Sequence, residues 1–295
     1  MYNKANFFWV GKLSIYEILS LKSFLANGFE ISFWTYEEKI ENLYLLKDLN
    51  IKIKDASGIL DIKLIEKFSQ GKQKASPASF ANLFRLEVLL KNGGWWFDLD
   101  CICLKNAENF KQLVSDKDYV LGREYENYIG NSVMYFSKPK IAQELVRNIN
   151  QLASEKNYTF YWGEIGPDLI TNYFSENKLM ESTLDEKYFY SVKAKNFNYF
   201  LKTNSNDRSL IEHQLKDSYV CHTWNEMLRK YNYNKNYLPP KFSYLGELFS
   251  KYYQNAPSKK RYSNLVNVKF VYGFGFINKL FYRIKILLKN RKMRL

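Results

Sequence analysis

Two aspartates, Asp98 and Asp100, follow an apolar run in the stretch NGGWWFDLD, residues 92–100. Paired carboxylates are unfavourable in a buried strand, and neighbouring tryptophans are unusual in a surface loop. Mg²⁺ and Mn²⁺ often bind through one or two carboxylates together with substrate phosphates. The pair therefore indicates a hard divalent cation and a phosphate-bearing substrate. Two acids at this spacing also occur in solvated turns, so the neighbouring elements decide between the two interpretations.

A zinc site is the alternative that the cysteines raise, and its ligands would be Cys101, Cys103, Cys221 and His222. If residues 95–104 form one strand, alternate side chains share a face. Asp98 and Asp100 then point one way and Cys101 the other. Cys221 and His222 are neighbours on a second predicted strand, so they also face opposite ways. The sequence therefore favours plain buried cysteines over a zinc site.

A helix is predicted directly before the aspartates. Ser76 suits the N-cap, Pro77 the first helical position and Gly93 the stop. Asn82 and Arg85 are three residues apart, so they share one face of this helix. In one interpretation they belong to a solvated polar stripe. In the other, Arg85 offers its fork of donors to a diphosphate or to sugar hydroxyl groups.

The elements that position these residues alternate between strand and helix up to residue 104. Strands are predicted at 6–11, 29–36, 50–56 and 95–104, and helices at 14–28 and 76–94. This order predicts an α/β fold with a parallel sheet covered by helices, and functional residues at the carboxyl ends of the strands. Further along, we expect two strands around a polar loop at 119–137, a helix at 140–152, a loop that enters a helix at 162–174, and a strand that ends in a turn at 219–230.

The segment ASFANLFRLEVLLKNGGWWFDLD, residues 78–100, resembles the signature of the DXD-containing sugar transferases. These include bacterial capsule and lipooligosaccharide transferases, the alpha-1,4-glycosyltransferases and, more distantly, the glucosylating bacterial toxins. The matching positions are Ala78, Phe80, Leu83, Phe84, Arg85, Gly93, Gly94, Trp96, Asp98 and Asp100. Two positions depart from the signature, since Ala81 replaces the usual Ser and Asn82 the usual Asp. Asn82 keeps a hydrogen-bond acceptor but brings no charge.

Three further segments are similar to the same family, in the same order. They are FFWVGKLSIYEILSLKSFLANGFEISFWTYE at 7–37, WGEIGPDLIT at 162–171 and YVCHTWNEM at 219–227. The resemblance spans roughly residues 6 to 230. It implies a GT-A fold, which is α/β with a mostly parallel central sheet, and a helical C-terminal extension. We expect a catalytic domain at 1–240 and a basic helical extension at 241–295.

The resemblance also implies roles for individual residues. Mn²⁺ or Mg²⁺ would be held by Asp98, Asp100 and His222, and catalysis would depend on both aspartates and Arg85. Glu164 and Asp168 would meet the acceptor. The nucleotide-sugar donor would contact Trp9, Gly11, Tyr36, Asn82, Arg85, Trp96, Asn131 and Trp224. For Trp9, Tyr36 and His222, ordinary core packing is the alternative.

The activity that the resemblance implies is transfer of a hexose from a nucleotide sugar, expected to be a UDP-sugar, to a hydroxyl of a surface glycan or glycolipid. Retention of configuration is expected. No residue of the sequence is marked as a dedicated nucleophile, so we expect same-face attack, with the departing phosphate taking the acceptor proton, over a covalent carboxylate intermediate. The alternative function is a catalytically silent sugar-nucleotide binder or a scaffold for glycan assembly.

The basic charge is concentrated at the C-terminal end. The chain has 44 Lys and Arg against 30 Asp and Glu, and residues 259–295 contain eleven Lys or Arg and no acid. The remainder is nearly neutral, which argues against a nucleic-acid-binding domain. As a helix, FINKLFYRIKILLKNRK at 276–292 would present one apolar face flanked by basic residues and would suit an anionic membrane surface. Packing of that helix on the body or on a partner chain is the alternative.

The expected location is the cytoplasm, at the inner face of the cytoplasmic membrane. The N-terminal sequence has no pattern of a secretory signal peptide, and no run of about 18 apolar residues occurs in the chain. The three cysteines are odd in number and are expected to be reduced thiols.

Overall fold

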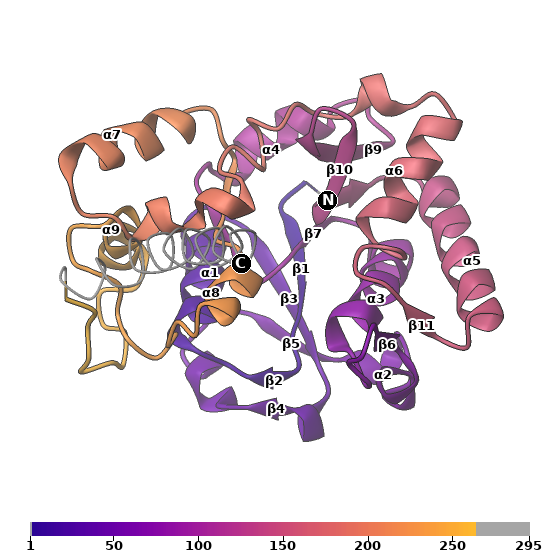
Figure 1. Cartoon of the computed structure of the whole chain (residues 1–295), viewed down its shortest axis with the longest axis horizontal. Helices are drawn as coiled ribbons and strands as arrows, with labels where there is room; N and C mark the ends of the chain where they lie inside the picture. The colour runs from indigo at the N-terminus through magenta and orange to yellow at the C-terminus, as the bar shows by residue number, and fades with distance from the viewer. Residues whose placement is uncertain (1, 264–295) are drawn as a thin grey trace, which may run out of the picture. The chain divides into compact units, whose positions relative to one another are not determined.

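The computed structural model describes residues 2–263 (Figure 1). Their contacts divide into two compact units. The first holds residues 2–193 and 214–223, and the second holds residues 194–213 and 224–263. The domain boundary expected after residue 240 stays a prediction. The helix expected at 276–292 lies outside the described residues.

A six-stranded sheet forms the centre of the first unit. Its strand order is β5 (Lys52–Asp55), β3 (Glu30–Thr35), β1 (Lys4–Phe8), β7 (Trp95–Phe97), β10 (Tyr128–Phe136) and β9 (Tyr119–Tyr125). The first four strands run parallel, whereas β10 and β9 are antiparallel to their neighbours. The predicted α/β fold with a mostly parallel central sheet is confirmed.

Helices cover both faces of this sheet. Successive side chains of β1 point to opposite sides, so each face offers apolar residues against which a helix can pack. Phe7 packs against Phe24 of α1 (Ile15–Ala26), with ring centroids 5.1 Å apart. Phe8 stacks on Phe84 of α3 (Pro77–Asn92) at 4.2 Å. On the α3 face, α5 (Pro139–Glu155) and α6 (Pro167–Glu176) add buried residues to the same core.

Local sequence signals set the ends of α1 and α3. Ser14 and Glu17 form a capping box at the start of α1. Ser76 caps α3, Pro77 is its first residue, and Gly93 ends it at a φ of 62°. The helix boundaries predicted from Ser76, Pro77 and Gly93 are confirmed.

The single strand predicted at 95–104 is wrong. Trp95–Phe97 form β7 of the main sheet, residues 98–100 form a turn, and Cys101–Cys103 form β8. The Cys101 N–H donates to the Asp98 carbonyl at 2.9 Å and closes the turn. After it, β8 leaves the main sheet and pairs antiparallel with β12 (Val220–His222).

The remaining elements of the first unit are short, apart from one helix. They are β2 (Gly11–Lys12), β4 (Ile40–Glu41), α2 (Lys63–Lys67), β6 (Ser69–Gln70), α4 (Ala107–Val114) and β11 (Thr159–Phe160), with 3-10 turns at Glu37–Lys39, Leu43–Leu46, Ala56–Gly58 and Met180–Ser182.

The described part of the second unit is largely helical. It contains a 3-10 segment at Ala194–Leu201, α7 (Ser205–Gln214), α8 (Asn225–Lys230) and α9 (Tyr244–Tyr252). Arg208 of α7 forms ion pairs with Glu212 at 2.9 Å and with Glu247 of α9 at 2.6 Å. Between residues 2 and 263, no helix is both long enough and apolar enough to span a membrane.

Candidate active site

Asp98 and Asp100 lie in the turn that follows β7, at the carboxyl end of a parallel strand, as predicted. The Asp98 carboxylate accepts from the Trp96 indole N–H at 2.7 Å and lies 3.4 Å from the Arg85 guanidinium. Its backbone N–H donates to the Ser132 carbonyl of β10 at 2.9 Å. The Asp98 side chain is therefore oriented by partners on α3, β7 and β10.

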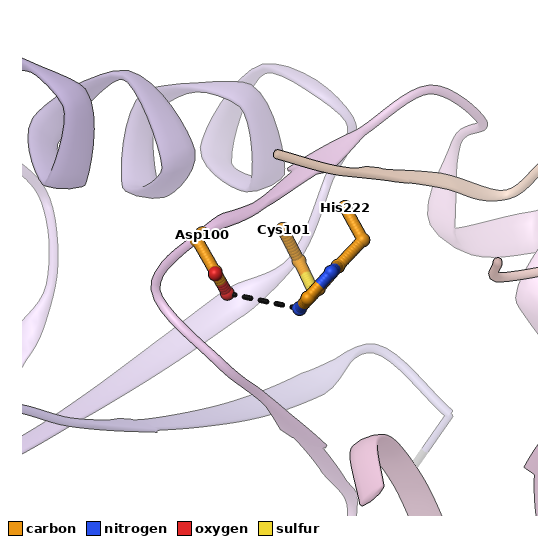
Figure 2. Close-up of side chains that lie close together, drawn as sticks. All are labelled: Asp100, Cys101 and His222. Atoms are coloured by element: carbon orange, nitrogen blue, oxygen red, sulfur yellow. Dashed lines mark ion pairs between the residues drawn. The ribbon is translucent and has the colours of Figure 1, made fainter. Parts of the chain in front are cut away.

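Asp100 faces a different partner, His222 of β12. The Asp100 Oδ1 and His222 Nε2 atoms are 3.2 Å apart, and both side chains are largely buried. Figure 2 shows this pair with the Cys101 side chain beside it. One ligand atom each from Asp100, Cys101 and His222 lies within 4.8 Å of the others, which makes this a group that could hold a metal ion.

The prediction that Cys101 faces away from the carboxylates is wrong. It assumed one continuous strand, whereas the turn at 98–100 resets the alternation of side chains. In the antiparallel pairing of β8 with β12, Cys101 lies directly opposite His222, and opposed residues share a face. Cys221 lies opposite Ile102 and so belongs to the other face.

Arg85 is buried, with 6% of its surface exposed, so the interpretation of a solvated stripe is wrong for this residue. Its Nε–H donates to the Ala81 carbonyl at 3.0 Å, and its Nη1 donates to the Asn131 carbonyl of β10. The guanidinium also lies 5.3 Å from the centre of the Trp96 ring. Several groups therefore hold Arg85 in place beside Asp98.

Asn82 and Asn131 meet at the start of α6. The Asn131 Nδ2 donates to the Asn82 Oδ1 at 2.9 Å. A Cβ atom on Gly166, the residue before α6, would lie 2.8 Å from that same Asn82 oxygen, so only glycine fits there without displacing its neighbours. Beside Arg85, three segments therefore meet: α3, β10 and the loop before α6.

Burial and charge shift the pKa of the acids and bases in this cluster. Burial raises the pKa of Asp98, with the Arg85 cation opposing this effect and the Asp100 carboxylate adding to it. Burial works to lower the pKa of His222, but the charge and hydrogen bond of Asp100 outweigh it, so that the pKa is raised. Burial raises the pKa of Cys101 well above its ordinary value. A dication would relieve the repulsion between the two carboxylates.

Two neighbours of His222 were not predicted from the sequence. The Tyr190 hydroxyl accepts from the Ser132 N–H at 3.0 Å, and its ring centroid lies 5.9 Å from that of His222. Glu124 of β9 is half-buried, and burial raises its pKa while the charges of His222 and Lys193 act in the opposite direction. Neither residue lies in a recognisable motif, and only the fold brings them to the site.

Three further residues predicted to contact the donor are Tyr36, Trp9 and Gly11. Tyr36 is buried in the core, where its ring lies 6.1 Å from that of Phe8 and its hydroxyl donates to the Leu60 carbonyl at 2.8 Å. Trp9 directly follows β1 and is half-buried, and Gly11 opens β2 at a φ of 94°.

Trp96 and Trp224 differ in their surroundings. Trp96 is buried in β7, and its indole is the hydrogen-bond donor to Asp98. Trp224 belongs to the second unit, where it precedes α8 in the left-handed region at a φ of 59°.

The two residues predicted to meet the acceptor lie in different environments. Glu164 is buried, pairs with Lys156 and accepts from the Tyr161 N–H at 2.9 Å. These contacts indicate that Glu164 stabilises the loop. Asp168 is half-buried and accepts from the Tyr128 hydroxyl at 2.7 Å. In the loop before α6, Tyr161 and Trp162 are 60% and 65% exposed.

Two protein-family models match successive parts of the chain. The glycosyltransferase sugar-binding region containing the DXD motif matches residues 17–120, which include Asn82, Arg85, Asp98 and Asp100. The alpha 1,4-glycosyltransferase conserved region matches residues 140–252, which include His222 and the loop before α6. No curated protein sequence matches the chain.

Solved glycosyltransferase structures resemble this one at low sequence identity. Mouse xyloside xylosyltransferase 1 in its apo form has 12% identity and a TM-score of 0.41, and the match covers 63% of this chain and 86% of that one. The PaToxG glycosyltransferase has 17% identity and a TM-score of 0.41, over 74% of this chain and 88% of that one. The apo WbbM bifunctional glycosyltransferase has 9% identity and a TM-score of 0.43, over 74% of this chain and 45% of that one.

Proposed function

Because the chain belongs to the DXD-containing glycosyltransferases, we propose that it transfers a hexose from a UDP-sugar to a hydroxyl of a surface glycan or glycolipid, with the help of a divalent cation. The observation that carries the proposal is the pair of Asp100, in the turn that follows β7, and His222 of β12, whose side chains are 3.2 Å apart.

The cation would be Mn²⁺ or Mg²⁺, held by Asp100 and His222 with Asp98 beside them. The donor set fits, because a carboxylate and an imidazole already face each other and a second carboxylate lies two residues away. When bound, the cation supplies positive charge to the donor diphosphate as it leaves. Asp98 is held by Trp96 and Arg85, so its proposed part is to orient the turn and add negative charge to the site.

Arg85, Asn82 and Asn131 line the donor side in this proposal. Two backbone carbonyls fix the position of the Arg85 guanidinium. Its remaining N–H groups are therefore held ready to donate to an anionic group such as a diphosphate. Asn82 and Asn131 hydrogen-bond to each other and keep further donors and acceptors for the hydroxyl groups of a sugar. Trp9, Gly11 and Trp96 of the first unit are proposed to contact the nucleotide, whereas the buried position of Tyr36 supports a packing role. The contact expected for Trp224, which belongs to the second unit, stays a prediction.

Retention of configuration remains our expectation. In same-face attack, the acceptor hydroxyl adds to the anomeric carbon on the side that the diphosphate leaves, and the leaving phosphate oxygen takes the hydroxyl proton. The position of Arg85 supports this route, because its guanidinium can stabilise charge on a departing diphosphate, and a cation held by Asp100 would do the same. A trapped glycosyl ester on an Asp or Glu, found by mass spectrometry, would contradict it.

The acceptor is proposed to lie over the loop before α6. Of the two predicted acceptor residues, Asp168 suits this role, since Glu164 is buried and is already paired with Lys156. Tyr161 and Trp162 of this loop expose aromatic surface, and such surface suits the apolar face of a sugar ring. Asp168 and the tyrosine hydroxyl groups supply acceptors and donors for the ring hydroxyls.

A lipid-linked acceptor would place the enzyme at a membrane. We therefore propose a peripheral location on the inner face of the cytoplasmic membrane, with the basic sequence of residues 259–295 attracted to anionic lipids.

Release of nucleoside diphosphate from a panel of sugar nucleotides, with and without Mn²⁺, tests the proposed function. We expect metal-dependent turnover of one donor that falls roughly 100-fold or more in Asp100→Ala. If no donor turns over but one gives a metal-dependent thermal shift, the chain is either acceptor-dependent or a silent binder. If no donor gave either turnover or a thermal shift, the proposed function would be refuted.

A further inference from the structure

The Cys101 thiol lies in the cluster that the proposed function assigns to a hard cation. Ligand atoms of Asp100, Cys101 and His222 are all within 4.8 Å of one another (Figure 2). Two structural features produce this arrangement: Asp100 ends the turn after β7, and the pairing of β8 with β12 puts Cys101 opposite His222. The sulfur is therefore part of the fold's geometry at this point and does not depend on a side-chain rotation at the surface.

These three donors are an oxygen, a nitrogen and a sulfur. Mg²⁺ and Mn²⁺ prefer oxygen ligands, whereas Zn²⁺ takes thiolate, imidazole and carboxylate together. A set of three protein ligands also leaves a fourth position of a tetrahedral zinc site open. The ligand types at this centre thus suit a softer cation at least as well as a hard one.

Neighbouring groups limit the set to these three donors. The Asp98 carboxylate is engaged by Trp96 at 2.7 Å and by Arg85 at 3.4 Å. Cys103 lies two residues further along β8, where its Sγ is 3.1 Å from the Lys105 carbonyl. Within residues 2–263, this is the one cluster of three or more His, Cys, Asp or Glu side chains with the spacing of a metal site.

We propose that this centre binds Zn²⁺ through the Cys101 thiolate, His222 and Asp100, and that bound Zn²⁺ excludes the hard cation required for transfer. Binding releases the thiol proton to solvent, as ligation by cysteine requires. The binding of Zn²⁺ is independent of the proposed function, whereas the exclusion of the hard cation rests on it. The sulfur makes the centre selective for a different metal from the one that supports turnover.

Spectroscopy with Co²⁺ tests this on the full chain. Co²⁺ takes the same ligand types as Zn²⁺, and a cobalt–thiolate bond gives an intense charge-transfer band in the near ultraviolet. We expect this band in the native protein and its loss on addition of Zn²⁺. In Cys101→Ser the band should disappear and the affinity for Zn²⁺ should fall roughly tenfold or more, with a smaller change for Mn²⁺.

Cys103→Ser is the matched control, since Cys103 is buried on the same strand and lies outside the cluster. It should keep both the band and the Zn²⁺ affinity. Absence of a thiolate band in the native protein overturns the proposal, even if Cys101→Ser does not fold. Persistence of the band in Cys101→Ser also overturns it, because another cysteine would then be the ligand.

The same protein separates this proposal from the proposed function. A thiolate band, with neither turnover nor a thermal shift for any sugar nucleotide, leaves the zinc site standing and refutes the proposed function. Turnover with Mn²⁺ that is insensitive to Zn²⁺, together with no band, leaves the proposed function standing and refutes the zinc site.

Discussion

Asn82 occupies the position at which the family signature carries Asp, and its hydrogen bond to Asn131 decides what a substitution there does. The Asn82 oxygen accepts from the Asn131 amide at 2.9 Å, and a carboxylate oxygen can accept the same bond. Asn82→Asp should therefore change the stability by less than about 1 kcal/mol, because the acceptor is kept. Asn82→Ala leaves the half-buried Asn131 amide without this partner and should destabilise by about 1–3 kcal/mol.

Urea unfolding of the two variants measures this difference. Donor turnover of Asn82→Asp, followed over the same panel of sugar nucleotides, shows in addition whether a negative charge at this position changes donor preference. Equal destabilisation by Asp and Ala would mean that the contact with Asn131 contributes nothing.

Arg85 is the second residue whose contacts make a definite prediction. Its Nε and Nη1 groups each donate to a backbone carbonyl, and it faces Asp98 from a buried position. Lysine keeps the charge but has no planar fork with which to reach both carbonyls. Arg85→Lys should destabilise by about 1–3 kcal/mol and also reduce turnover.

The exposed Arg147 of α5 is the matched control for this prediction. Arg147→Lys should change the free energy of unfolding by less than about 0.5 kcal/mol. If the two substitutions had the same effect in chemical denaturation, the buried contacts of Arg85 would not be the reason for its presence.

At the scale of elements, the start of α6 is fixed to α3 and β10 by close packing at Gly166. A Cβ atom there would lie 2.8 Å from the Asn82 oxygen and 2.9 Å from the Asn131 nitrogen. Gly166→Ala should therefore destabilise by about 1–3 kcal/mol through overpacking, and should weaken donor binding by displacing both amides. Thermal unfolding and donor titration measure the two effects.

Gly58 provides the control, because nothing lies within 4 Å of the position that its Cβ would take. Gly58→Ala should leave donor binding unchanged. A Gly166→Ala variant with native stability and donor affinity would show that α6 adjusts its position freely, contrary to the packing described here.

The exposed aromatic residues of the loop before α6 give a kinetic prediction. If sugar rings of the acceptor stack on Trp162, Trp162→Ala should raise the acceptor KM roughly tenfold, which corresponds to about 1.4 kcal/mol, and should leave the donor KM within about twofold. Tyr44→Ala is the control, since Tyr44 is 71% exposed in another part of the first unit. An equal rise in both KM values for Trp162→Ala would point to a general disturbance of the site.

The elements also show where reasoning from the sequence succeeds and where it stops. Helix α3 was predicted with its ends, because Ser76, Pro77 and Gly93 act locally and their signals are independent of tertiary structure. The strand expected at 95–104 was wrong because a turn within an apolar stretch leaves no Gly or Pro to mark it. The position of Cys101 beside His222 follows from a strand pairing between residues more than a hundred positions apart, which periodicity cannot reveal.

The burial of polar residues also depends on tertiary structure and could not be predicted from the sequence. The sequence places Arg85 on one helix face with Asn82, but it does not indicate whether that face meets solvent or protein. Burial of Arg85 depends on β10, which supplies the Asn131 carbonyl. Tyr190 and Glu124 carry no sequence signal, because their part in the site comes only from the fold.

For the whole molecule, the uneven distribution of charge leads to the last prediction. Residues 259–295 hold eleven of the 44 basic residues and no acid, so the other positions have 33 basic against 30 acidic residues. A nearly neutral body gains little from an anionic surface, whereas each Lys or Arg close to such a surface contributes about 1 kcal/mol, attenuated by salt within a Debye length.

A chain truncated after Lys260 should consequently lose most of its binding to vesicles that contain phosphatidylserine. The full chain should bind these vesicles, release them as the salt concentration rises, and show little binding to neutral phosphatidylcholine vesicles. Co-sedimentation measures all three. Donor turnover of the truncated chain is the internal control, because the described site residues all precede the truncation. Unchanged vesicle binding after truncation would assign membrane contact to the body and remove the charge argument, whereas loss of turnover together with binding would mean that the segment supports the fold of the enzyme.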